Sequence, residues 1–168
     1  DIQALPAREA MVEFLVRLSL QQYKNLSMPE DYVDEARKIA RIARRMLRKE
    51  IPLTDAIHQW GNLAALVSSL YSGDLDLMGR SLCDVIAEPT RAVLIPGFKQ
   101  VKQSALAKGA IGCSISGAGP AVFALTKTTE IAAEVGQEMK ASFAKVGLEA
   151  EKYVSKINCL GSHVVKEC

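Results

Sequence analysis

The stretch "GAIGCSISGAGPAVFAL", Gly109 to Leu125, decides how the second half of this chain folds. Two short apolar runs flank a cluster of glycine, serine and proline, a pattern typical of two strands joined by a turn. Glycine permits positive φ angles and also lets another group approach the backbone closely. The cluster around Gly117, Gly119 and Pro120 is therefore either a hairpin turn or a ligand-contacting loop. The residues alone favour the turn, because the spacing fits neither a P-loop nor the dinucleotide fingerprint.

The segments around this stretch are mainly helical in pattern. Apolar spacing predicts helices within residues 7–26, 30–50, 53–74, 75–89, 95–110 and 129–147. Thr54 or Asp55 is the expected cap of the third helix, Gly73 its end, and Pro89 the end of the fourth. Residues 149–158 and 161–167 each read as a strand. The mixture predicts an α+β fold, with helices packed on one face of a small, mainly antiparallel sheet.

Composition excludes several classes of protein. The chain has 168 residues, 49% hydrophobic and 24% charged, which is typical of a soluble globular protein. A net charge of +2 gives no reason to expect nucleic acid or a membrane surface as a partner. Four cysteines without a C-x-x-C pair, and only two histidines, argue against a zinc site. The absence of a secretory pattern predicts a cytoplasmic location with free thiols, Cys113 being a buried apolar residue.

Two further segments carry candidate site residues. In "EPTRAVLIPGF", Glu88 to Phe98, two prolines stiffen a connection that contains Arg91. Its planar fork of donors suits a carboxylate or phosphate, although a surface position or a pairing with Glu88 is the commoner reading. In "HQWGNLAAL", the only tryptophan, Trp60, is expected in a core or an interface, and His58 is weak as an acid or base without a visible partner.

Together, "IHQWGNLAALVSSL", "DVIAEPTRAVLIPGF" and "KGAIGCSISGAGPAVFAL" resemble the C-terminal half of the homoserine kinases, a family of GHMP small-molecule kinases. The resemblance runs from about Leu53 to the C-terminus. It implies a ferredoxin-like C-terminal domain that faces an N-terminal nucleotide-binding domain across the active-site cleft. It also implies ATP- and Mg²⁺-dependent phosphorylation of L-homoserine to O-phospho-L-homoserine, a step of threonine biosynthesis.

The resemblance also assigns roles to particular residues. Arg91 would bind the homoserine carboxylate, and a second arginine would assist. The ungapped register places Arg44 there, whereas Arg37 matches the local letters better but needs a gap. The loop residues Gly117, Ala118 and Gly119 would contact the substrate, supported by Ser116, Pro120 and Glu88. The resemblance assigns no catalytic base and no metal ligand, and His58 is not a candidate.

The chain departs from the family in its first part. The Gly-Leu-Gly-Ser-Ser phosphate loop is absent from the sequence, and "LRK" replaces the usual Leu-Pro-Lys turn. Residues 1–34 look like added helices where the family has a strand and a short loop, which leaves 35–168 as the substrate-side domain. We therefore expect a piece of a longer protein, inactive alone, completed by the N-terminal kinase domain in cis or in trans. A homodimer, a non-catalytic GHMP-type binding or assembly module, and another GHMP kinase are the alternatives.

Overall fold

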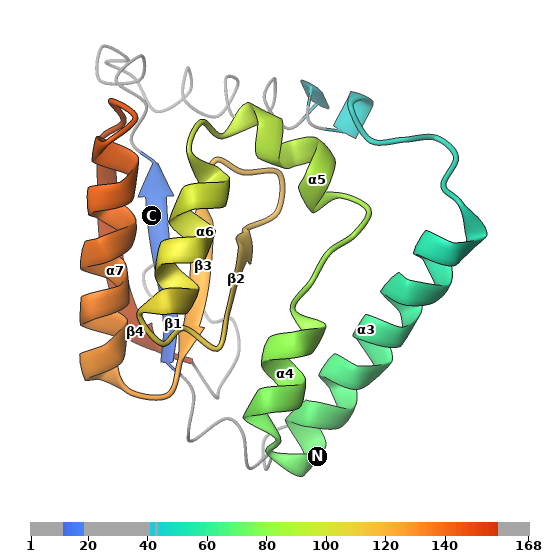
Figure 1. The fold of residues 1–168 in the computed structure, drawn as a ribbon, viewed down its shortest axis with the longest axis horizontal. Coiled ribbons are helices and arrows are strands. Elements are labelled where there is room, and N and C mark those ends of the chain that lie inside the picture. Colours follow the sequence, from blue (N-terminus) through green and yellow to red (C-terminus); the bar gives the residue numbers. More distant parts are fainter. Residues whose placement is uncertain (1–11, 19–40, 43, 158–168) are drawn as a thin grey trace, which may run out of the picture.

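The computed structural model describes residues 12–18, 41–42 and 44–157, and its centre is a four-stranded sheet (Figure 1). The strands are β1 (Val12–Leu18), β2 (Gly112–Ile115), β3 (Val122–Thr126) and β4 (Ala150–Lys156). Their order is β2-β3-β1-β4, and every neighbouring pair is antiparallel. The predicted hairpin on either side of the glycine cluster is thus confirmed as β2 and β3.

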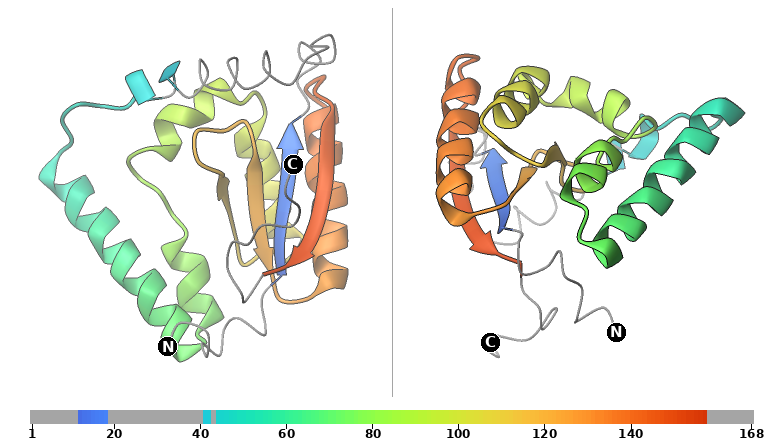
Figure 2. Two further views of the ribbon diagram at one scale, coloured as in Figure 1. Left: turned by 180° about the vertical axis from the view of Figure 1, so that it is seen from behind. Right: turned by 60° about the horizontal axis from the view of Figure 1, so that its bottom comes forward.

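Two helices cover one face of this sheet, as Figures 1 and 2 show. Helix α6 (Phe98–Ala107) leads into β2, and α7 (Thr129–Ala144) connects β3 to β4. The unit β1-α6-β2 and the unit β3-α7-β4 interleave in the sheet. Strand β3 lies between β1 and β2, and β1 lies between β3 and β4. This split arrangement is the ferredoxin-like topology, so the expected α+β fold is confirmed.

The prediction of a helix within residues 7–26 is wrong where the chain forms β1 (Val12–Leu18). The segment "VEFLVRL" satisfies the period of a strand as well as that of a helix, because charged Glu13 and Arg17 alternate with apolar neighbours. In the fold it pairs on both edges, Val12 standing opposite Thr126 of β3 and Lys156 of β4. Those backbone partners come from distant parts of the chain, and they override the local preference.

This correction removes one departure from the family. A strand stands within residues 1–34, where the resemblance implied one and the apolar spacing did not. The other residues of that segment lie outside the described part of the chain, and so does the strand predicted at 161–167. The division of the chain at residue 34 stays a prediction.

The main core lies between the sheet and these two helices. Val135, Met139 and Phe143 of α7 are completely buried, and they share one apolar cluster with Val101 of α6 and Val122 of β3. Burial of each such side chain contributes about 1.5–3 kcal/mol. The core therefore fixes α6 and α7, and with them the strands that carry the glycine loop.

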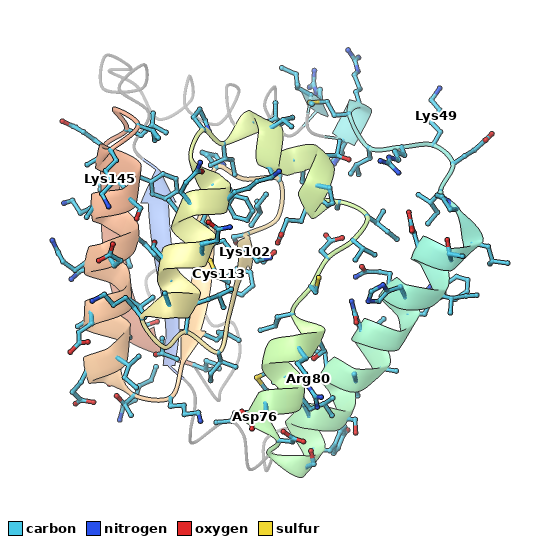
Figure 3. All side chains as sticks on the ribbon, viewed as in Figure 1. Lys49, Asp76, Arg80, Lys102, Cys113 and Lys145 are labelled. Carbon is cyan, nitrogen blue, oxygen red and sulfur yellow. The ribbon has the colours of Figure 1, made fainter. Side chains whose placement is uncertain are left out.

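Cys113 of β2 belongs to the same cluster, as the sequence predicted. Burial raises the pKa of its thiol to about 12, because a thiolate loses its hydration there. Figure 3 shows Cys113 beside Lys102 in the middle of the domain. The thiol is a packing group rather than a nucleophile.

A second pair of helices lies at the β2 edge of the sheet (Figures 1 and 2). These are α3 (Leu53–Ser72) and α4 (Leu75–Ser81), and Gly73 ends α3 in the left-handed region, as predicted. Met78 of α4 is completely buried against Leu66 and Leu70 of α3 and Leu125 of β3. This small cluster attaches the helix pair to the sheet.

Several helix ends differ from prediction. Helix α3 begins at Leu53 behind Pro52 without a side-chain cap, so neither proposed capping residue has that role. The helix expected within 75–89 ends at Ser81, and Pro89 lies in the first turn of a new helix, α5 (Glu88–Arg91). Proline suits a first turn, because the N–H that it lacks has no helical partner there. A short 3₁₀ turn, η3 (Ala92–Leu94), follows α5.

Two further points concern the segment before α3 and membrane-spanning helices. Of the helix predicted over residues 30–50, residues 41–42 and 44–45 are helical, residues 46–50 are turn and irregular chain, so the prediction is wrong there, and residues 30–40 and 43 lie outside the description. None of the helices within the described ranges is both long and apolar enough to cross a membrane.

Candidate functional site

The candidate site forms where α5 meets the glycine loop, which we define as residues 116–121. Arg91 Nη1 donates a hydrogen bond of 2.6 Å to the carbonyl oxygen of Gly117, which is 26 residues away in sequence. The structure therefore brings together the two segments that the sequence singled out. The Nε–H of Arg91 is buried and has no hydrogen-bond partner in the part of the chain that the structure describes. A buried donor without a partner is costly, so the described residues leave this guanidinium incompletely satisfied.

The glycine loop is a tight turn with one open side. The Ser116 N–H donates to Ala121 O at 2.8 Å, and the Gly119 N–H donates to Ser116 O at 3.0 Å. Gly117 and Gly119 have φ angles of 59° and 79°, and the Gly119–Pro120 peptide bond is cis.

The two glycines differ in their surroundings. A Cβ on Gly119 would stand 3.0 Å from Ile95 Cδ1, whereas a Cβ on Gly117 would meet no atom within 4 Å. Gly119 thus allows close packing, and Gly117 faces open space. The hairpin interpretation is confirmed, and substrate contact by Gly117, Ala118 and Gly119 stays a prediction.

Glu88 anchors α5 to the body of the domain. Its Oε1 forms an ion pair with Lys102 Nζ of α6 at 2.5 Å, and its Oε2 accepts from Ser114 Oγ of β2 at 2.6 Å. Only 13% of the Glu88 side chain is exposed, so these charge-assisted bonds offset the cost of burying the carboxylate. Among the described residues, Glu88 is engaged by Lys102 and Ser114 rather than by Arg91. Ser116 and Pro120 are part of the turn, and their supporting role at a substrate site stays a prediction.

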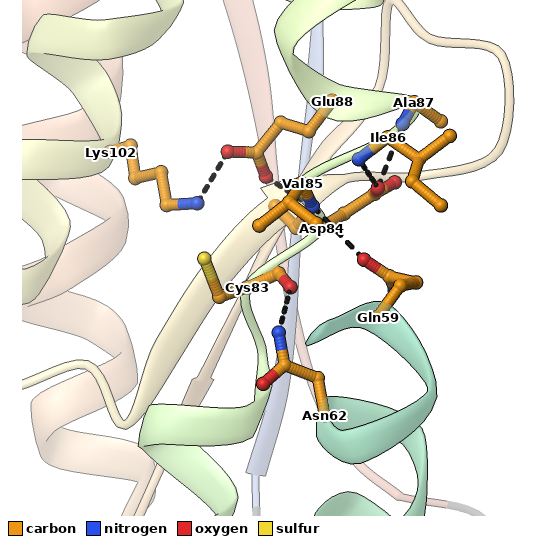
Figure 4. A network of polar contacts seen from close by, with 10 residues as sticks. Gln59, Asn62, Cys83, Asp84, Val85, Ile86, Ala87, Glu88 and Lys102 are labelled. Carbon is orange, nitrogen blue, oxygen red and sulfur yellow. Dashed lines mark hydrogen bonds and ion pairs between the residues drawn. The ribbon is translucent and has the colours of Figure 1, made fainter. Parts of the chain in front are cut away.

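A second set of polar contacts holds the segment that precedes α5, residues 82–87, which we call the connector (Figure 4). Asn62 Nδ2 of α3 donates to Cys83 O at 2.7 Å, and the Val85 N–H donates to Gln59 Oε1 at 3.0 Å. Within the connector, Asp84 Oδ1 accepts from the N–H groups of Ile86 and Ala87, each at 2.8 Å. The connector is therefore fixed both by its own cap and by α3.

The remaining candidates lie elsewhere. Arg44 is exposed in the short helical piece formed by residues 41–42 and 44–45, which lies near α5 in Figures 1 and 2, and its role as second clamp stays a prediction. Arg37 falls outside the described residues. His58 is exposed on α3. Trp60 is 62% exposed, because it lies on the outward face of α3, so the expected place in a core is wrong and the alternative, an interface, stays a prediction.

The residues that sequence reasoning missed act over long separations. Lys102 and Ser114 lie 14 and 26 residues from Glu88, and no local pattern marks them. Gln59 and Asn62 lie in the quoted segment "HQWGNLAAL" as polar residues near the start of a helix. A helical i, i+3 spacing places them on one face, which was the available signal.

Comparison with known proteins fits this geometry. Residues 66–145 match the family described as GHMP kinases C terminal. The chain contains a GHMP kinase C-terminal domain. The match spans α4, α5, the glycine loop and α7, and so includes both Arg91 and Gly117.

Curated relatives refine the comparison. The homoserine kinase of Chlorobaculum tepidum is 48% identical over 125 residues, which make up 73% of this chain and 39% of that protein. The homoserine kinase of Xanthomonas campestris pv. campestris is 41% identical over 149 residues, 86% of this chain and 46% of that protein. The chain thus spans less than half of the length of these two relatives.

Solved structures agree with this placement. The crystal structure of homoserine kinase from Cytophaga hutchinsonii superimposes with a TM-score of 0.73 at 40% identity, covering 90% of this chain and 42% of that one. A galactokinase from Lactococcus lactis matches with a TM-score of 0.52 at 12% identity, over 88% of this chain and 45% of that one. At that identity the second likeness concerns the fold alone.

Proposed function

We propose that this chain is the substrate-side part of a homoserine kinase. The observation that carries the proposal is the guanidinium of Arg91, held by Gly117 O on one side and left with a buried, unpartnered Nε–H on the other. Such a fork binds a planar carboxylate in two-point fashion. The similarity to homoserine kinases over 73% to 86% of the chain supports L-homoserine as the ligand.

In the proposed reaction, the side-chain hydroxyl of L-homoserine attacks the γ-phosphorus of ATP. A new P–O bond forms, the bond to the β-phosphate oxygen breaks, and the hydroxyl proton is released. The products are O-phospho-L-homoserine and ADP. The contribution of this chain is positioning, which accounts for much of the catalysis of phosphoryl transfer. Arg91 holds the carboxylate end of the substrate, and the glycine loop forms the wall beside it.

The described residues do not fit ATP and Mg²⁺. The sequence has no phosphate loop of the expected kind, and within the described ranges no group of three or more His, Cys, Asp or Glu side chains has the geometry of a metal site. We propose that a nucleotide-binding domain, in cis or in trans, holds both. A catalytic base is not assigned to this chain, and the proposal places the complete enzyme in threonine biosynthesis in the cytoplasm.

The test is a fusion. The N-terminal part of the Chlorobaculum tepidum enzyme, up to the start of its matched region, is joined to this chain, and ADP release is measured with and without L-homoserine. We expect homoserine-dependent ADP release and phosphohomoserine detectable by mass spectrometry, while the chain alone releases none. A folded fusion that binds ATP but ignores homoserine would contradict the proposal and favour a non-catalytic assembly module. Turnover of a different small alcohol would indicate another GHMP kinase.

A further inference from the structure

We propose that Gln59 and Asn62 of α3 are positioning residues that keep Arg91 in its binding geometry by holding the connector. The hydrogen bonds of the two amides to the connector are part of the structure. Their effect on substrate binding rests on the proposed function of Arg91. Neither residue touches the glycine loop among the described contacts, so each acts through the backbone that leads to α5.

The need for such support comes from α5 itself. The helix has four residues, and so short a helix has no stability of its own in water. Its orientation, and with it the direction of the Arg91 side chain, must be set by contacts with the rest of the domain. On the sheet side Glu88 provides these contacts through Lys102 and Ser114. The connector side needs a counterpart.

That counterpart is α3. Gln59 and Asn62 are three residues apart on the helix and therefore share one face. They meet two backbone groups of opposite kind, the carbonyl of Cys83 and the N–H of Val85, at 2.7 and 3.0 Å. One amide donates and the other accepts, so each role is fixed by its partner. Figure 4 shows both bonds reaching the connector on either side of Asp84, whose carboxylate caps the residues that lead into α5.

The opposite roles allow a matched pair of variants. Gln59→Glu keeps an acceptor for the Val85 N–H, so the contact survives. Asn62→Asp has nearly the same shape, yet it loses the donor and sets a carboxylate against the Cys83 carbonyl oxygen. The same amide-to-carboxylate change should therefore be tolerated at 59 and harmful at 62. Gln59→Leu removes the acceptor and should resemble Asn62→Asp.

The first measurement uses this chain alone. Hydrogen exchange is followed by mass spectrometry in peptides that cover residues 82–91, together with unfolding in urea. We expect Asn62→Asp and Gln59→Leu to accelerate exchange there about tenfold, as for the loss of one hydrogen bond that leaves its partner unsatisfied. Gln59→Glu should match wild type, whereas the unfolding equilibrium constant of the other two variants should rise by up to the same tenfold, because the lost bond exists only in the folded state. If Asn62→Asp leaves exchange in residues 82–91 at the wild-type rate, the Asn62 amide does not hold the connector and the proposal is wrong.

The second measurement uses the fusion with the Chlorobaculum tepidum N-terminal part. We expect Asn62→Asp to raise the KM for L-homoserine about tenfold while kcat changes less than about threefold, with Gln59→Glu near wild type. Equal behaviour of Asn62→Asp and Gln59→Glu would overturn the assigned hydrogen-bond roles. Faster exchange without a change in KM would overturn the positioning of Arg91. A fusion inactive on homoserine would contradict the proposed function, and the exchange results would still decide whether α3 holds the connector.

Discussion

Helices α7 and α3 have similar patterns of apolar residues, but the fold buries the apolar face of α7 and leaves that of α3 exposed. On α7 the apolar residues Val135, Met139 and Phe143 are completely buried against the sheet. On α3 a stripe of large apolar side chains faces outward, with Trp60 62% exposed; its members are Leu53, Ile57, Trp60, Leu63, Val67 and Tyr71. Apolar spacing thus predicts that a helix has an apolar face, but it does not say whether the fold covers that face. The core depends on α7, whereas α3 contributes the polar contacts that hold the connector.

The largest expected difference between the two helices is in stability. Phe143→Ala should lower the free energy of unfolding by about 3–5 kcal/mol, because it removes a completely buried ring from a packed core. Trp60→Ala should change it by less than about 0.5 kcal/mol, as is usual for exposed positions. Urea unfolding of both variants measures the contrast. A loss at Trp60 comparable to that at Phe143 would mean that the outer face of α3 is covered.

A second contrast uses one glycine from each helix of the α3–α4 pair. A Cβ on Gly79 would lie 2.5 Å from the Ile111 carbonyl oxygen, so Gly79→Ala must push α4 away from the start of β2. We expect it to destabilise by about 1–3 kcal/mol, in the range of overpacked cores. Gly61 of α3 has no atom within 4 Å of such a Cβ, and Gly61→Ala should stabilise by about 0.5–1 kcal/mol through helix propensity. Effects of the same sign at both positions would contradict this packing of α4.

The last contrast concerns pH and distinguishes the buried core from the surface. The pKa of Cys113 is raised from 9.0 to about 12 by burial, so the folded state holds its proton more tightly than the unfolded state. The associated stability is complete below pH 9 and is lost as pH rises toward 12, at no more than about 1.4 kcal/mol per pH unit. Cys113→Ala should flatten this decline in urea unfolding between pH 8 and about 11. Cys83→Ser, at an exposed position, is the control, and it should leave the decline of stability with pH unchanged. Identical pH profiles for wild type and Cys113→Ala would show that the thiol is not buried.

Local signals explain what the sequence predicted correctly. The glycine cluster marked the hairpin, and Gly73 marked the end of α3, because positive φ angles favour glycine wherever they occur. What failed depended on distant partners. β1 is a strand because β3 and β4 flank it, and the break between α4 and α5 depends on the cap formed by Asp84 and on the amides of α3.

The same distinction between local signals and distant partners holds for the candidate site. Its residues, Arg91 and the glycines, could be identified from the sequence, and the resemblance implied their role. The contacts that build the site could not be predicted, because they join residues 14 to 26 positions apart. Glu88 illustrates this limit, since sequence alone offered Arg91 as its partner and the fold supplies Lys102 and Ser114 instead.

The most direct test of the carboxylate role of Arg91 compares two substrates in the fusion enzyme. L-homoserine carries the carboxylate, and 3-aminopropan-1-ol has the same hydroxyl and amine without it. Arg91→Ala should lower kcat/KM for homoserine about tenfold to a hundredfold, in line with about 1.5–3 kcal/mol for a lost charged hydrogen bond, and should leave the low kcat/KM for the amino alcohol nearly unchanged. An equal loss for both substrates would contradict carboxylate binding by Arg91, and so would no loss for either.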